Sequence, residues 1–309
     1  MANDTQQAFK ARKEQMDAFG TGILVSFSVL LGLNQALVKL VNAGLAPVFQ
    51  AGLRSACAFI PVLIWSLLKR RRLSFTDGSF KPGMLNGLFF SLEFCLLFTA
   101  LEYTSVARVS LFFYIMPFWV AIGAHFLIPE EPLTRRKVIG LILAVAGVSL
   151  ALSDDNSKPT ANAWIGDLFS LIAALFWAAL ALVTRTTRLS KCAPEMNLLY
   201  QLGFSAVFLI LLAPVFGDTV RQLTPEIIAI FLFQVIFVAA VGFLVWMWAL
   251  TVYPVTEMAS FSLLAPVSGV FFGWLIFDDR LSFAFFTAVL LVGAGLVVIN
   301  RRPTDPHRE

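Results

Sequence analysis

Three charged side chains, Lys39, Arg54 and Glu93, stand inside long apolar runs of this sequence. A charge at the centre of a bilayer costs about 2.5–3.5 kcal/mol on insertion scales, so such residues usually face a cavity or one another. We expect Glu93 to bind a proton or an ammonium group, and Lys39 or Arg54 to meet a carboxylate or to balance Glu93. Salt bridges among the three are the structural alternative.

Polar and small residues recur in the same runs at spacings of three and four, which places them on one face of a helix. Tyr114 and Trp177 could stack on an aromatic or cationic ligand. Simple packing is the alternative, because 14% of the chain is aromatic. Arg108 is expected at a helix end, paired with Glu102. The candidate substrate-binding residues are Glu93, Lys39, Arg54, Asn34, Gln35, Asn86, Tyr114, Trp177 and Ser170.

The elements that carry these residues are predicted to be membrane-spanning helices. Apolar residues make up 59% of the chain and charged residues 14%, whereas soluble domains have about 45–50% and about 25%. Runs of about 20 apolar residues have the length of a bilayer-spanning helix. Ten are predicted, at 20–41, 47–68, 83–102, 106–128, 135–152, 163–185, 194–215, 225–250, 256–277 and 281–300.

The placement of positive charge predicts how these helices cross the membrane. If residues 1–19 form a cytoplasmic tail, 17 of the 23 Lys and Arg residues fall on the cytoplasmic side and three on the other. Such a bias sets membrane orientation, so we interpret the net charge of +4 as a topology signal and expect no nucleic-acid partner. Both termini, including the tail at 301–309, are predicted to be cytoplasmic, in a protein of the inner (plasma) membrane.

The chain also contains an internal repeat. Pro117 and Pro266 lie 149 positions apart, and Gly147 and Gly295 lie 148 apart. A period near half the chain indicates a duplicated unit, here 20–152 and 163–300. With five helices in each unit, the two copies are inverted, as in many secondary transporters. Pro117 and Pro266 are expected to kink their helices, because proline removes a backbone hydrogen bond.

The pattern Ala-Leu-x-Tyr-Thr-Ser-Val-Ala-Arg at 100–108, followed by Pro117 and Glu131-x-Leu-Thr, resembles the EamA domain of the drug/metabolite transporter superfamily. A looser second copy has Val-Thr-Glu at 255–257 and Asp-Arg-Leu-Ser at 279–282. Arg54 fits the arginine usual in the second helix of that family. The resemblance implies a ten-helix transporter with a central cavity, and members carry substrates as different as amino acids, sugars, nucleotides and cationic drugs.

The predicted function is export of amino acids or related zwitterions by alternating access, since both charge signs are expected near one cavity. A carrier of organic cations is the first alternative, and an intramembrane lipid-acting enzyme is a remote one. No motif for a nucleophile, phosphate loop or metal set is present, so neither enzymatic activity nor a cofactor is expected. The expected partners are a small-molecule substrate, the lipid bilayer and a proton as candidate coupling ion, with the chain acting as a monomer or homodimer.

Overall fold

The computed structural model describes residues 17–300, except for 72, 130, 155, 157–158, 243–244, 246–248 and 250–263. The N-terminal tail up to residue 16, the C-terminal tail at 301–309 and the Val-Thr-Glu segment at 255–257 therefore lie outside the described residues. Helices and short connections make up the described part, which contains no named β-strand and only one isolated bridge, between Leu45 and Val220.

Local sequence signals set the helix ends. α2 (Ala18–Val41) begins after Asp17, whose carboxylate accepts a hydrogen bond from the Gly20 N–H at 2.8 Å. This interaction satisfies a backbone donor that the helix itself leaves free. Proline occupies the first position of α3 (Pro47–Leu68) and of α9 (Pro194–Leu212), where its missing N–H is not needed. For these three helices the bounds predicted from apolar runs, 20–41, 47–68 and 194–215, agree with the observed ones to within three residues.

The remaining described helices follow the predicted runs. They are α4 (Phe80–Tyr103), α5 (Val106–Phe113), α6 (Met116–Leu127), α7 (Arg135–Ser153), α8 (Ala163–Thr186), α10 (Pro225–Phe233), α13 (Leu264–Phe277) and α14 (Phe283–Asn300). Short 3-10 turns, η2 (Arg188–Lys191) and η3 (Ala213–Phe216), flank α9, and a π-helix, η4 (Gln234–Gly242), continues α10.

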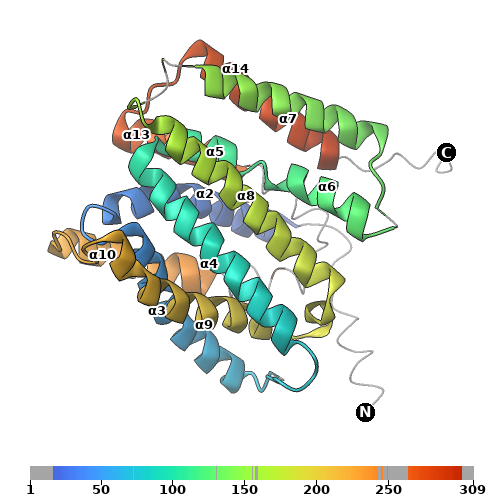
Figure 1. Cartoon of the computed structure of the whole chain (residues 1–309), viewed down its shortest axis with the longest axis vertical. Coiled ribbons are helices and arrows are strands. Elements are labelled where there is room, and N and C mark those ends of the chain that lie inside the picture. The colour runs from blue at the N-terminus through green and yellow to red at the C-terminus, as the bar shows by residue number, and fades with distance from the viewer. Residues whose placement is uncertain are drawn as a thin grey trace.

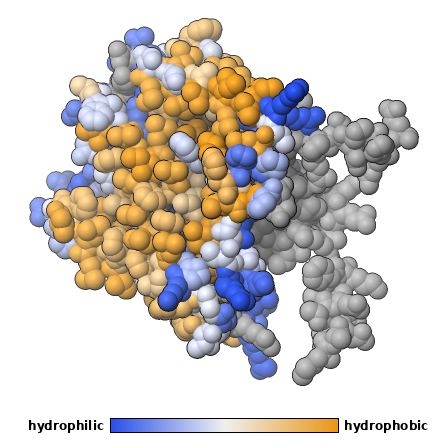
Figure 2. All heavy atoms as spheres, turned by 45° about the vertical axis from the view of Figure 1, so that its right-hand side comes forward, coloured by the Kyte–Doolittle hydropathy of each residue, from blue (hydrophilic) through white to orange (hydrophobic). Residues whose placement is uncertain are grey.

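Eight segments are long and apolar enough to cross a bilayer, and two shorter apolar helices, α13 and α14, follow them within the described residues. Large apolar side chains such as Phe126, Leu211 and Ile142 are more than half exposed. Figure 2 shows apolar side chains over most of the face in view, with hydrophilic ones gathered mainly toward its edges. An apolar exterior of this kind matches lipid, and the chain is a multi-pass, all-α membrane protein.

The most extensive helix contacts join the N-terminal half to the C-terminal half. α4 packs on α8 and α9, α3 packs on α9, and α13 packs on α2 and α5. α7 and α14 pair mainly with each other and lie side by side along one edge of the bundle (Figure 1). The largest buried apolar cluster takes residues from α2, α3, α4, α5 and α8 among others, so the core lies between the halves.

The helix that carries Pro117 is interrupted. α5 ends at Phe113, a turn follows at Tyr114 and Ile115, and α6 then starts with Pro117 as its second residue. Proline cannot donate to the carbonyl of Phe113, so the α-helical ladder is broken at this turn. Pro266 is the third described residue of α13, and the residues before Leu264 lie outside the described part.

Candidate functional site

Polar contacts define two ends of the bundle. The Thr104 end holds the α4–α5 turn, Asp167 and Asp279, which are joined by hydrogen bonds. The Glu131 end holds Glu131 with Arg185, and Arg71 with Glu195 at 2.9 Å. Glu93 lies ten residues before the end of α4 at the Thr104 end, about 15 Å along the axis. Glu93, the central residue of the predicted site, therefore lies well away from the Thr104 end and inside the bundle.

Glu93 and Arg54 are both buried, each with 4% of its surface exposed. The Arg54 guanidinium lies over the rings of Phe94, at 4.5 Å, and Phe98, at 4.8 Å. These contacts are cation–π interactions, which are stronger away from water. Arg54 and Glu93 interact electrostatically. Neither charged group makes a hydrogen bond or a direct ion pair with another described residue, so both retain their bonding capacity.

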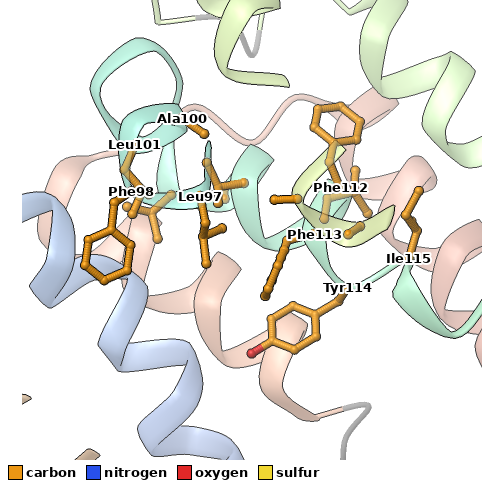
Figure 3. Packing of buried hydrophobic residues seen from close by; sticks show 14 of the residues in the cluster. Leu97, Phe98, Ala100, Leu101, Phe112, Phe113, Tyr114 and Ile115 are labelled. Carbon is orange, nitrogen blue, oxygen red and sulfur yellow. The ribbon is translucent and has the colours of Figure 1, made fainter. Parts of the chain in front are cut away.

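An aromatic group adjoins this pair. The Trp177 ring stacks on Phe113 at 4.7 Å and 15°, and meets the Tyr114 ring edge to face at 5.8 Å and 72°. Tyr114 lies within electrostatic reach of Glu93. Figure 3 shows Phe113 and Tyr114 projecting to the same side of the α5–α6 link, away from Phe112. The break before Pro117 thus directs two aromatic rings toward the bundle interior.

The predicted amide and hydroxyl residues divide into two groups. Gln35 accepts a hydrogen bond from Ser110, which ties α2 to α5, whereas the side-chain oxygen of Asn34 is buried and has no partner within the described ranges. Asn86 lies elsewhere, nearer the Glu131 end, and donates to Asn197 at 2.8 Å and Thr184 at 3.1 Å. Ser170 donates to the carbonyl of Gly166 in its own helix. Asn34 and Asn86 each keep one side-chain oxygen without a partner among the described residues.

Lys39 lies at the Thr104 end. Its Nζ donates to the Thr104 carbonyl at 2.8 Å and stands 5.2 Å from the centre of the Phe277 ring. Asp279 lies within electrostatic reach of Lys39 and accepts a hydrogen bond from the Ala107 N–H at 2.9 Å. Lys39 therefore joins α2 to the α4–α5 turn. Its predicted contact with substrate stays a prediction.

Arg108 corrects an expectation from the sequence. It is fully buried and forms a two-pronged ion pair with Asp167, with Nε to Oδ1 at 3.0 Å and Nη2 to Oδ2 at 2.6 Å. Its Nη1 donates to the Ala151 carbonyl at 2.9 Å, and Glu102, the predicted partner, instead pairs with Arg221. The prediction was wrong because α8 packs against the start of α5 and brings a nearer carboxylate.

Two glutamines were missed by the sequence analysis. Gln50 in α3 and Gln234 at the start of η4 are both fully buried, and neither side-chain amide has a hydrogen-bond partner among the described residues. Gln50 stands one helical turn before Arg54, a spacing that could have identified it. Gln234 is a single polar residue in an apolar run, and no sequence signal marked it.

The described residues contain no cluster of three or more His, Cys, Asp or Glu side chains that could hold a metal ion. A groove of about 560 Å³ lies between α2 and η4, lined by Phe27, Phe237 and other mostly apolar side chains. None of the predicted substrate-binding residues lines this groove. The candidate polar residues Arg54 and Glu93 therefore lie outside this groove, in the interior of the bundle.

The profile of the EamA-like transporter family matches this chain twice, at residues 18–153 and 164–301. The two matches cover most of the chain, which therefore belongs to the EamA-like transporter family and contains two EamA repeats. This membership confirms the resemblance drawn from the sequence motifs.

Relatives of full length bear transporter names. The uncharacterized transporter YoaV of Bacillus subtilis is 22% identical over 88% of this chain and 94% of its own length. A probable amino-acid metabolite efflux pump of Escherichia coli is 25% identical over 90% and 93%, respectively. A solved crystal structure superposes with a TM-score of 0.62 at 20% identity, over 92% of this chain and 96% of that one, which supports the fold alone.

Proposed function

We propose that this protein is a secondary transporter that exports amino acids or related zwitterions by alternating access. Arg54 and Glu93 carry the proposal, because two opposite charges are buried in one region without a direct bond to each other. A zwitterion brings both complementary groups: its carboxylate meets Arg54 and its ammonium meets Glu93. The adjoining aromatic group, with Phe94 and Phe98, suits a bulky or apolar side chain.

The proposed architecture is ten membrane-spanning helices in two inverted five-helix repeats. In the described residues α2 runs from the Glu131 end to the Thr104 end, whereas α8, which opens the second half, runs the other way. We place the Thr104 end outside the cell and the Glu131 end in the cytoplasm, as the Lys and Arg distribution predicts. Rocking of the halves about the central site would expose it to each side in turn.

The first test is a thermal-shift screen of the purified protein against amino acids, polyamines, choline-like cations, sugars and nucleosides. A ligand that binds only the folded protein raises its melting temperature. Zwitterions should stabilise the parent, and Glu93→Gln should weaken their binding by about tenfold or more, since hydrogen bonds to charged groups contribute about 1.5–3 kcal/mol. Glu131→Gln, on the exposed ion pair with Arg185, is the matched control and should bind like the parent.

The organic-cation alternative gives a different outcome, because it needs Glu93 and the aromatic rings but no carboxylate ligand. Choline-like or polyamine cations alone would then stabilise the parent, and Arg54→Leu would leave their binding intact. Zwitterion binding unchanged by both Glu93→Gln and Arg54→Leu would contradict the site assignment. Uptake of the best binder into inside-out vesicles, with and without a pH gradient, tests the direction of transport and proton coupling.

A further inference from the structure

We propose that Gln234 is a specificity-determining residue whose side-chain amide donates a hydrogen bond to the substrate carboxylate beside Arg54. The proposal rests on the zwitterion transport proposed above and extends it to the C-terminal half of the chain. It assigns a role to a helix from which the sequence analysis selected no binding residue.

The burial of Gln234 is the first observation. The side chain is fully buried, and in the part of the chain that the structure describes both its amide nitrogen and its amide oxygen lack a hydrogen-bond partner. Removing an amide from water without replacing its hydrogen bonds is unfavourable, and native proteins rarely leave such groups unpaired. A polar ligand that enters the bundle would supply the missing partner.

The direction of the side chain follows from its neighbours. Ile236, Phe237 and Val241 are 45–50% exposed, and two of them, Phe237 and Val241, line the groove between α2 and η4. Gln234 and Val235 lie on the opposite, buried face, which contacts α3. The Gln234 amide is therefore directed into the bundle.

The depth of Gln234 places it level with Arg54. Val235 shares an apolar cluster with Leu53, and further along the two helices Ala239 shares another with Ala58. α3 and the α10–η4 segment thus run in the same direction, which puts Gln234 at the level of the α3 turn that carries Gln50 and Arg54.

Gln50 adds a second amide of the same kind. It stands four residues before Arg54, on the same face of α3, and it too is fully buried, with neither polar atom paired to a described residue. Each free amide offers N–H donors, which suit a carboxylate, and an oxygen, which can accept from an ammonium group. A quaternary cation has neither an acceptor nor an N–H donor to offer these amides, so this arrangement favours a zwitterion.

The backbone supplies an independent observation. Gln234 is the first residue of η4, a nine-residue π-helix. π-Helical segments are rare and occur frequently at functional sites. The change of helical pitch at Gln234 alters which residues of the segment face α3. The start of the π-helix and the unpaired amide therefore coincide at the same residue.

The experiment compares the parent with Gln234→Met, which keeps an unbranched side chain of similar length without the amide. The probes are L-phenylalanine, L-leucine and L-threonine, each with its carboxamide, which lacks the negative charge. We expect Gln234→Met to raise the Kd of every amino acid that binds the parent by about tenfold or more, and to reduce the parent's preference for the acid over its carboxamide. Gln50→Met should change the same preference in the same direction.

Ile236→Leu is the control, because it changes an exposed side chain of the same π-helix and should bind like the parent. Without ligand, Gln234→Met should melt at the parent's temperature or above it, since an unpaired buried amide has been removed. A lower melting temperature with an unchanged preference for the acid would overturn the proposal and make Gln234 structural. If none of the amino acids binds the parent, the zwitterion function fails, and the melting temperature of the unliganded variant still decides whether Gln234 is structural.

Discussion

Two buried arginines in the N-terminal half of this transporter have opposite surroundings. All three nitrogens of the Arg108 guanidinium donate hydrogen bonds, two to Asp167 and one to the Ala151 carbonyl. Arg54 instead rests on two phenylalanine rings near Glu93 and donates no hydrogen bond to a described residue. A charge whose bonds are complete holds helices together, whereas a charge with free donors remains available to a ligand.

The largest loss of stability is expected when the ion pair of Arg108 is disrupted. Asp167→Ala leaves a fully buried guanidinium without its carboxylate, and such a loss costs about 3–5 kcal/mol. We expect a large fall in melting temperature or failure to purify as a monodisperse protein. Arg221→Ala removes one partner of the partly exposed pair with Glu102 and should cost about 1 kcal/mol or less. Equal melting temperatures for the two variants would show that the Arg108 pair does not stabilise the fold.

Replacing both members of each pair by leucine sharpens the contrast. Arg54→Leu with Glu93→Leu removes two charges that lack direct bonds, so the melting temperature should hold or rise while substrate-induced stabilisation disappears. Arg108→Leu with Asp167→Leu leaves the Thr104 hydroxyl without its partner, which costs about 1–3 kcal/mol, and removes one of the two hydrogen bonds that the Ala151 carbonyl accepts. Thermal unfolding with and without an amino-acid ligand measures both effects. A greater destabilisation by the first double variant would reverse our assignment of the two pairs.

The smallest effect is expected at Asp279, in the connection between α13 and α14. Burial raises the pKa of this carboxyl, and the Ala107 N–H and Lys39 partly oppose the rise. Between the ordinary pKa of 3.8 and the raised value, the folded protein binds more protons than the unfolded one. The free energy of unfolding should therefore fall as pH increases through this window.

Asp279→Asn keeps an acceptor for the Ala107 N–H and removes the titration. Melting temperatures measured upwards from about pH 4 should decline less steeply for this variant than for the parent. Identical slopes would mean that Asp279 ionises in the folded protein as it does in the unfolded chain.

Helix positions were predictable because a bilayer requires continuous apolar runs, and the run at 47–68 has the same bounds as α3. Arg54 and Glu93 were also recognisable, since a charge in an apolar run is conspicuous. The partner of Arg108 was not, because Asp167 lies 59 residues away and only the packing of α8 brings them together. Gln234 escaped notice because its unpaired state depends on what surrounds it. Ten spans in inverted repeats remain a prediction.

The pairing of α7 with α14 has a consequence for biogenesis. A methyl group on Gly147 would press on the Ala288 carbonyl at 2.8 Å, and one on Gly295 on the Gly140 carbonyl at 2.7 Å, so the two backbones are in close contact. Gly147 and Ala288 are 141 positions apart. At about 5–20 residues per second, a ribosome needs roughly 7–28 s to make that length of chain. During this interval α7 lies in the bilayer without α14, its main packing partner. The nascent protein therefore passes through a half-assembled stage that membrane quality control could recognise.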